Sequence, residues 1–229
     1  MATEPHAVPT SAAARATGRG EKLEAGPSRF VADPAALGLA GFALATMILS
    51  IINVGALPKS TLPLALCTAL AYGGIVQLLA GMWAFIKNDT FAAVALSSYG
   101  GFWISFWALN QFFLPKIPVA DQGGALSLYL FCWALFSFYM WIISLRVSVA
   151  VMAVFLTLWP TYVLLGLGKA LDSNLLFNIG GGFGIATAAF AWYTSFAITA
   201  NHTTRRDWIP VGETRSVQQD AGNGVPAHN

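Results

Sequence analysis

The chain has 229 residues, of which 56% are hydrophobic and only 10% are charged, and its formal net charge is +2. Soluble domains average about 25% charged residues, so this composition excludes an ordinary soluble globular domain. The small net charge provides no strong field for nucleic acid, and we expect no nucleic-acid partner. The two cysteines, Cys67 and Cys132, lie inside apolar runs and are predicted to be buried. No zinc-type cluster of Cys and His occurs in the sequence, so we expect no metal and no cofactor.

The two ends of the chain differ in composition from its middle. Residues 1–32 are rich in Ala, Pro, Gly, Ser and charged side chains, and residues 207–229 have a similar character. Neither end carries enough apolar surface to fold alone. We therefore expect a disordered N-terminal tail (1–32), a transmembrane domain (33–206) and a C-terminal tail (207–229).

Six apolar stretches separated by short polar links make up the middle of the chain. Crossing the hydrocarbon core of a bilayer takes about 20 apolar residues of helix, and each stretch has roughly that length. The stretches are Leu37–Leu57, Leu62–Ile86, Phe91–Leu114, Ala125–Ser144, Val147–Leu167 and Leu175–Ala200. They predict an all-α integral membrane protein with six transmembrane helices, in which neighbouring helices are antiparallel hairpins. The boundary between the fourth and fifth spans depends on Arg146 alone.

The distribution of Lys and Arg predicts the orientation, because cytoplasmic loops carry an excess of positive charge. With the N-terminus inside, three of the 12 basic residues lie outside, namely Lys59, Lys116 and Lys169, and the others are cytoplasmic. We therefore expect a multi-pass protein of the cell membrane with both termini in the cytoplasm.

No predicted span contains Asp, Glu, Lys, Arg or His. Intramembrane carboxylates usually mark proton or cation relays, so a pump with an embedded acidic relay is not expected. A membrane enzyme would also lack a buried base or ligand set, and we predict that the protein is not an enzyme. The neutral polar residues that remain suit a path for a small, weakly polar solute.

Small residues recur along the spans. Gly180 and Gly184 form a G-x-x-x-G pattern that Ala188 continues. Such rows let helix backbones approach closely in lipid. Packing within one bundle is the favoured interpretation, with a dimer seam or room for a pore as alternatives.

Four short stretches form an ordered set of motifs along the spans. They are Asp33-Pro34-Ala35-Ala36-Leu37-Gly38-Leu39 followed by Gly41-Phe42; Tyr72-Gly73-Gly74 with Gln77 and Ala80-Gly81; Asn88-Asp89-Thr90-Phe91; and Ser98-Tyr99-Gly100 with Phe102-Trp103. In order and spacing this set resembles the acetate uptake transporter family, which includes bacterial succinate–acetate permeases and fungal acetate and ammonia-export-associated proteins. Ile209-Pro210-Val211-Gly212-Glu213 is similar to the short C-terminal motif of that family.

The resemblance implies protomers of six helices that assemble into hexamers, each with its own path for acetate or a related short carboxylate such as succinate. It also implies a narrowest ring formed by Phe42, Tyr99 and Leu158. Such a ring is a hydrophobic constriction that can gate by dewetting, and the tyrosine hydroxyl would offer the carboxyl one hydrogen bond. The substrate path is expected to include Asp33, Pro34, Leu37, Gly38, Leu39, Asn53, Tyr72 and Gln77.

The chain departs from the family pattern at several positions. The first motif usually begins Asn-Pro-Ala-Pro, whereas this chain has Asp33 and Ala36 at the first and fourth places, and Ala84 stands where the family often has an acid. These changes bear on substrate choice and proton coupling. The residues leave open a channel or a proton symporter, a path for ammonia, urea or water, and a scaffold or sensor that acts through its tails.

Overall fold

The computed structural model describes residues 31–212. It contains six helical segments that are long and apolar enough to cross a membrane, as predicted. Four are single helices: α2 (Pro34–Asn53), α6 (Val119–Ser144), α7 (Val149–Ala170) and α8 (Asn174–Thr204). The second segment combines η2 (Lys59–Thr61), α3 (Leu62–Thr68), η3 (Ala69–Val76) and α4 (Gln77–Ile86), and the third combines α5 (Thr90–Ala108), η4 (Leu109–Phe113) and η5 (Leu114–Lys116).

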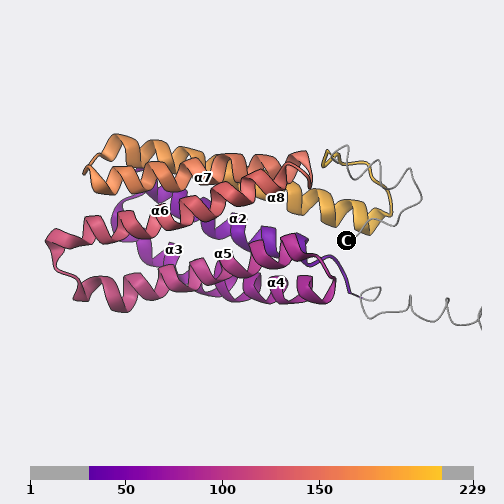
Figure 1. Ribbon diagram of the computed structural model, residues 1–229, viewed down its shortest axis with the longest axis horizontal. Helices are drawn as coiled ribbons and strands as arrows, with labels where there is room; N and C mark the ends of the chain where they lie inside the picture. Colours follow the sequence, from indigo (N-terminus) through magenta and orange to yellow (C-terminus); the bar gives the residue numbers. More distant parts are fainter. Residues whose placement is uncertain (1–30, 213–229) are drawn as a thin grey trace, which may run out of the picture.

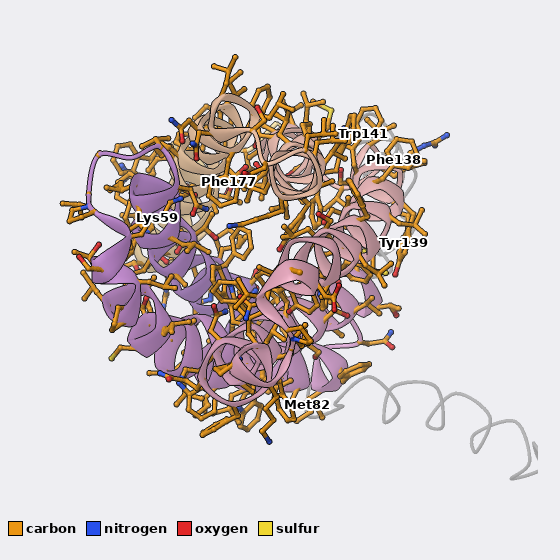
Figure 2. All side chains as sticks on the ribbon, turned by 90° about the vertical axis from the view of Figure 1, so that its left-hand side faces the viewer. Lys59, Met82, Phe138, Tyr139, Trp141 and Phe177 are labelled. Atoms are coloured by element: carbon orange, nitrogen blue, oxygen red, sulfur yellow. The ribbon has the colours of Figure 1, made fainter. Side chains whose placement is uncertain are left out.

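The helices lie side by side along the long axis of the molecule, and the described chain enters and leaves the bundle at the same end (Figure 1). Helix α8 packs against α2 and α7, α6 packs against α7, and α4 packs against α5. Viewed along the axis, the helices form a ring, with Met82, Phe138 and Tyr139 on its outer side (Figure 2). The cavities lie between the helices of this ring.

Helix starts are defined by side-chain caps. The carboxylates of Asp33 and Asp89 accept hydrogen bonds from backbone N–H groups of α2 and α5, both at 2.9 Å. Ser148 accepts in the same way at the start of α7, at 3.2 Å. A cap satisfies one of the N–H groups that have no partner within the helix, which explains why α6 and α7 are separate helices even though little polar sequence divides them.

Two predicted boundaries and the burial of the cysteines are wrong. The first helix ends at Asn53 rather than Leu57, because Gly55 turns the chain with φ 81° and Pro58 follows in extended conformation. The fourth helix begins at Val119 rather than Ala125. Cys67 and Cys132 are both exposed on the protein surface, since apolar residues of a membrane protein also face lipid.

Glycines allow the close approach of neighbouring backbones. A Cβ at Gly180 would lie 3.0 Å from the backbone nitrogen of Leu165, and one at Gly181 would lie 2.8 Å from that of Val54. Gly184 and Ala188 are also buried, so the small-residue row of α8 packs inside the bundle, which confirms the favoured interpretation. Gly182 has open space around it.

The residues after α8 fold back onto the start of α7. The carbonyls of Gly212 and Val211 accept hydrogen bonds from the backbone N–H groups of Val149 and Ala150, at 2.8 and 3.0 Å. The side chain of Asn201 holds Ile209 through bonds to its N–H and carbonyl. The packed structure therefore extends past the expected domain boundary at residue 206 to Gly212, and the predicted tail residues 1–30 and 213–229 lie outside the described part.

Adjacent glycines in α5 offer a test of this packing. A Cβ at Gly100 would lie 2.7 Å from the backbone nitrogen of Leu78, whereas nothing lies within 4 Å of one at Gly101. We expect Gly100→Ala to separate α5 from α4 and lower the free energy of unfolding by about 1–3 kcal/mol, since overpacking costs that much. Gly101→Ala should be neutral or slightly stabilising, because alanine is the better helix former. Thermal unfolding of both variants in detergent compares them directly, and equal midpoints would contradict the packing argument.

Candidate functional site

Two cavities lie within the ring of helices. The first has a volume of about 170 Å³, and we call it the lysine cavity because the charged residues in its lining are Lys59 and Lys169. The uncharged polar residues in its lining include Ser50, Asn53, Asn110 and Thr161. The second, of about 210 Å³, is lined by Asp33 and Asp89 and is called the aspartate cavity; its polar lining includes Gln77, Ser148 and Thr194. Because Asp33 precedes α2 and Lys59 follows it, the two cavities are near opposite ends of the bundle.

An apolar layer separates the two cavities. Leu158 lines both of them and is only 2% exposed. Phe42 and Tyr99 line the aspartate cavity, while Phe102 and Tyr162 line the lysine cavity. The ring centroids of Phe42 and Tyr99 are 5.5 Å apart. Of the three residues expected to form a constriction, Leu158 thus lines both cavities, and Phe42 and Tyr99 line the aspartate cavity within the same buried cluster.

Tyr99 is held by a hydrogen-bond chain to α6. Its hydroxyl lies 2.8 Å from the hydroxyl of Ser137, which donates its own proton to the carbonyl of Trp133 at 2.7 Å. Since a serine hydroxyl has one proton, Tyr99 is the donor to Ser137. The Tyr99 hydroxyl is therefore engaged by Ser137 in this geometry, and its donation to a passing carboxyl stays a prediction.

Aromatic rings surround Tyr99 on several sides. Its ring centroid lies 5.2 Å from that of Phe136, 6.0 Å from that of Trp133 and 6.1 Å from that of Phe155. These separations are within the range of favourable aromatic pairs. The ring of Tyr99 is thus fixed from α6 and α7 while its other side faces Phe42.

The remaining residues predicted for the path divide into two groups. Asp33, Leu39 and Gln77 line the aspartate cavity, and Asn53 lines the lysine cavity. Among the lining residues of these two cavities, the other predicted positions do not occur, namely Pro34, Leu37, Gly38 and Tyr72. Leu37 is 48% exposed on the outside of the bundle, and Gly38 is buried where a Cβ would meet Leu96.

Several lining residues were not singled out from the sequence. From the sequence, Lys59 and Lys169 are only basic residues outside the spans, Phe102 is only a motif residue, and Tyr162 belongs to no motif. Two buried polar atoms of the lysine cavity, Thr46 Oγ1 and Trp103 Nε1, have no hydrogen-bond partner among residues 31–212. In the aspartate cavity the same holds for Gln77 Oε1. Each of these atoms has almost no accessible surface, so it is shielded from the cavity interior although its residue lines the cavity.

A family model described as the GPR1/FUN34/yaaH family matches residues 18–212 of the chain. The chain belongs to this family. The resemblance inferred from the four motifs is thereby confirmed, and with its six membrane-capable helices the protein is a multi-pass membrane protein.

Similar proteins come from fungi and bacteria. "Acetate permease A" of Emericella nidulans is 38% identical over 199 residues, covering 80% of this chain and 67% of that protein. "Ammonia transport outward protein 2" of Saccharomyces cerevisiae is 36% identical over 183 residues, covering 76% of this chain and 64% of that protein. The chain thus spans about two thirds of the length of these fungal relatives.

The bacterial relative is matched over nearly its whole length. "Succinate-acetate/proton symporter SatP" of Escherichia coli K12 is 32% identical over 186 residues, covering 80% of this chain and 97% of that protein. A solved structure of "the bacterial acetate channel SatP" superposes with a TM-score of 0.73 at 30% identity, covering 80% of this chain and 99% of that chain. The six-helix fold is therefore the fold of this channel.

The Tyr99–Ser137 pair can be tested by a double-mutant cycle. Ser137→Ala leaves the buried Tyr99 hydroxyl without its acceptor, which should lower the free energy of unfolding by about 1–3 kcal/mol. Tyr99→Phe removes the donor, so adding Ser137→Ala to it should cost less than Ser137→Ala alone. Thermal unfolding in detergent measures all three variants, and strictly additive costs would show that the two hydroxyls are not coupled.

Proposed function

We propose that this protein is a membrane transporter or channel for acetate and related short carboxylates, succinate among them, and that it is not an enzyme. The observation that carries the proposal is the pair of cavities that meet at one apolar layer around Leu158, inside a bundle with the fold of an acetate channel. Relatives named for acetate and succinate support the substrate class. Following the Lys and Arg bias, the aspartate cavity faces the cytoplasm and the lysine cavity faces outward.

The lining chemistry agrees with a small carboxylate. The side-chain amide of Asn53, a neutral donor in the lining of the lysine cavity, can solvate a carboxyl group that has left bulk water. A weak acid can also cross in its neutral form, because carboxyls of this kind have pKa values of about 4–5. The apolar layer then excludes hydrated ions while it admits a small solute with one polar end.

Phe42, Tyr99 and Leu158 are proposed as the constriction of this path. All three are nearly fully buried, with exposed fractions of 3%, 3% and 2%. An apolar ring of this kind resists wetting, so water and ions do not leak through it at rest. Tyr99 contributes its ring to this barrier, and its bond to Ser137 keeps the ring in position.

Assembly into a homo-oligomer, a hexamer by family resemblance, is part of the proposal. Large apolar side chains are exposed on the outer faces of α6 and α8, for example Leu135, Phe190 and Phe196. Such faces suit contact with lipid and with further copies of the chain. Each protomer has its own cavities within its own ring of helices, so each would carry an independent path.

A path for ammonia is the second candidate, with urea and water as further small solutes. One observation favours it: the charged residues that line the aspartate cavity, Asp33 and Asp89, are both acidic and would attract ammonium. A relative named for outward ammonia transport is consistent with this. Both carboxylates, however, already bind helix N–H groups, which offsets part of their charge.

Uptake of radiolabelled acetate into proteoliposomes, with and without an inward proton gradient, tests the proposal. Competition by propionate would support a carboxylate path. A rise with the proton gradient would indicate proton symport or passage of the neutral acid, whereas indifference at fixed voltage would indicate an anion channel. Absence of uptake by folded protein would overturn the carboxylate proposal in favour of ammonia, urea or water, which the same vesicles can test.

Tyr99→Ala tests the constriction. Removing the ring should widen the apolar layer and change acetate flux severalfold, with weaker discrimination against larger carboxylates. Phe85→Ala is the matched control, because it removes a similarly large ring from a side chain of α4 that is 54% exposed and lines neither cavity, and it should leave flux unchanged. The measurement is initial uptake of acetate and of a larger carboxylate. Equal flux and selectivity in Tyr99→Ala and the wild type would remove Tyr99 from the path.

A further inference from the structure

We propose that Lys59 and Lys169 form a binding station for carboxylate anions at the mouth of the lysine cavity, and that this station sets the affinity of the path for anions from that side. The inference rests on the proposed function and adds to it the residues that select the anion. It starts from the fact that these lysines, which come from different parts of the chain, line the same cavity.

Lys169 is held in position by the bundle. It lies in the last turn of α7, is only partly exposed, and its Nζ lies 4.6 Å from the centroid of the Phe177 ring of α8. A cation over an aromatic face is attracted by the ring, which restrains a side chain that is otherwise flexible. Lys59 is exposed and comes from the short η2 helix after α2. One lysine is therefore anchored and the other is free to move toward a ligand.

Uncharged polar residues also belong to the lining of this cavity. Trp103 Nε1 and Thr46 Oγ1 both belong to residues that line it, and these residues are 2% and 6% exposed. Neither atom has a hydrogen-bond partner in the described part of the chain. The indole N–H can only donate, so its natural partner is an acceptor such as a carboxylate oxygen. Both atoms are themselves covered, so the neutral donor that an anion leaving the two lysines meets is the Asn53 amide in the lining of the cavity.

A structural explanation of Lys169 is that a cation near a helix C-terminus stabilises the helix dipole. This accounts for its sequence position, and Asp172 nearby attracts its charge in addition. It does not account for a second lysine on the same cavity, or for the contrast with the other end. There the charged lining residues are Asp33 and Asp89, each bound to the amides of a helix start. The path is therefore electropositive at one mouth and carries capped carboxylates at the other.

This polarity has consequences for selectivity. Two positive charges at one mouth raise the local concentration of anions and repel ammonium. A dicarboxylate gains more from the pair than a monocarboxylate, because both of its charges are attracted. The station therefore favours carboxylate anions over ammonium. It also favours succinate over acetate, a discrimination by charge that the uncharged apolar layer cannot provide.

The test compares Lys59→Gln, Lys169→Gln and the double variant in proteoliposomes at neutral pH. Loss of both charges should raise KM for acetate by roughly three- to ten-fold, and KM for succinate by more, with the maximal rate within about two-fold of wild type. Added salt should raise the wild-type KM but have little effect on the double variant, because screening acts only on charges that are present.

Lys116→Gln is the matched control. Lys116 ends the third span at the same end of the bundle, and its Nζ also lies over an aromatic ring, 5.5 Å from the centroid of Phe113, but it lines neither cavity. Its loss should leave KM unchanged. Lys169→Arg, which keeps the charge, should retain most of the wild-type affinity, so that a packing defect at Phe177 is distinguished from loss of charge.

Three results would overturn the station. An equal rise of KM in Lys116→Gln would reduce the effect to general surface potential. Unchanged KM in the double variant, with wild-type acetate uptake intact, would refute the station while leaving the proposed function in place. A folded wild type without any carboxylate uptake would refute the proposed function itself, and the station with it.

Discussion

The constraint on which the rest of this structure depends is that a bilayer offers no hydrogen bonds to the backbone or to hydroxyl groups. The protein meets it locally: hydroxyls within the spans bind carbonyls of their own helix, as Thr161 does with Thr157 and Thr194 with Phe190, both at 2.8 Å. Most polar side chains are therefore already satisfied and unavailable to a solute. Within residues 31–212 the unpaired buried side-chain atoms are divided: those of Thr46, Gln77 and Trp103 belong to residues that line the two cavities, whereas those of Ser97, Trp141 and Trp159 do not.

Close packing of glycines turns six helices into a ring with a defined interior. Where Gly100 meets the backbone of Leu78 and Gly181 meets that of Val54, the helices approach without intervening side chains. The large side chains then collect at one level, where Phe42, Tyr99 and Leu158 are buried together. The proposed constriction is thus a consequence of how small and large residues are distributed along the helices, and it needs no charged group in the membrane.

The six helices were predictable because each must be apolar over about 20 residues to cross a bilayer, and such stretches can be recognised in the sequence. Their ends were less so: Leu57 is apolar, yet Gly55 ends the helix before it, and the apolar-to-polar change alone does not reveal such a turn. Which face of a helix meets lipid was not predictable either, since apolar residues surround these helices on all sides, and Cys67 and Cys132 are exposed for that reason. Family motifs pointed to Phe42 and Tyr99, whereas the shared cavity of Lys59 and Lys169 depends on tertiary structure that no local pattern encodes.

The charged residues that line the two cavities lie at their mouths, and their effect differs between the two ends. Asp33 and Asp89 stabilise the fold, because each carboxylate accepts a hydrogen bond from an N–H group at a helix start and compensates the positive end of the helix dipole. Lys169 contacts an aromatic face rather than a carboxylate, so its charge is restrained without being neutralised by an ion pair at that contact. A path with neutral donors in the middle and an accessible positive charge at one end binds an anion before it is dehydrated. The cost of dehydration is then met in steps along the path and not all at the apolar layer.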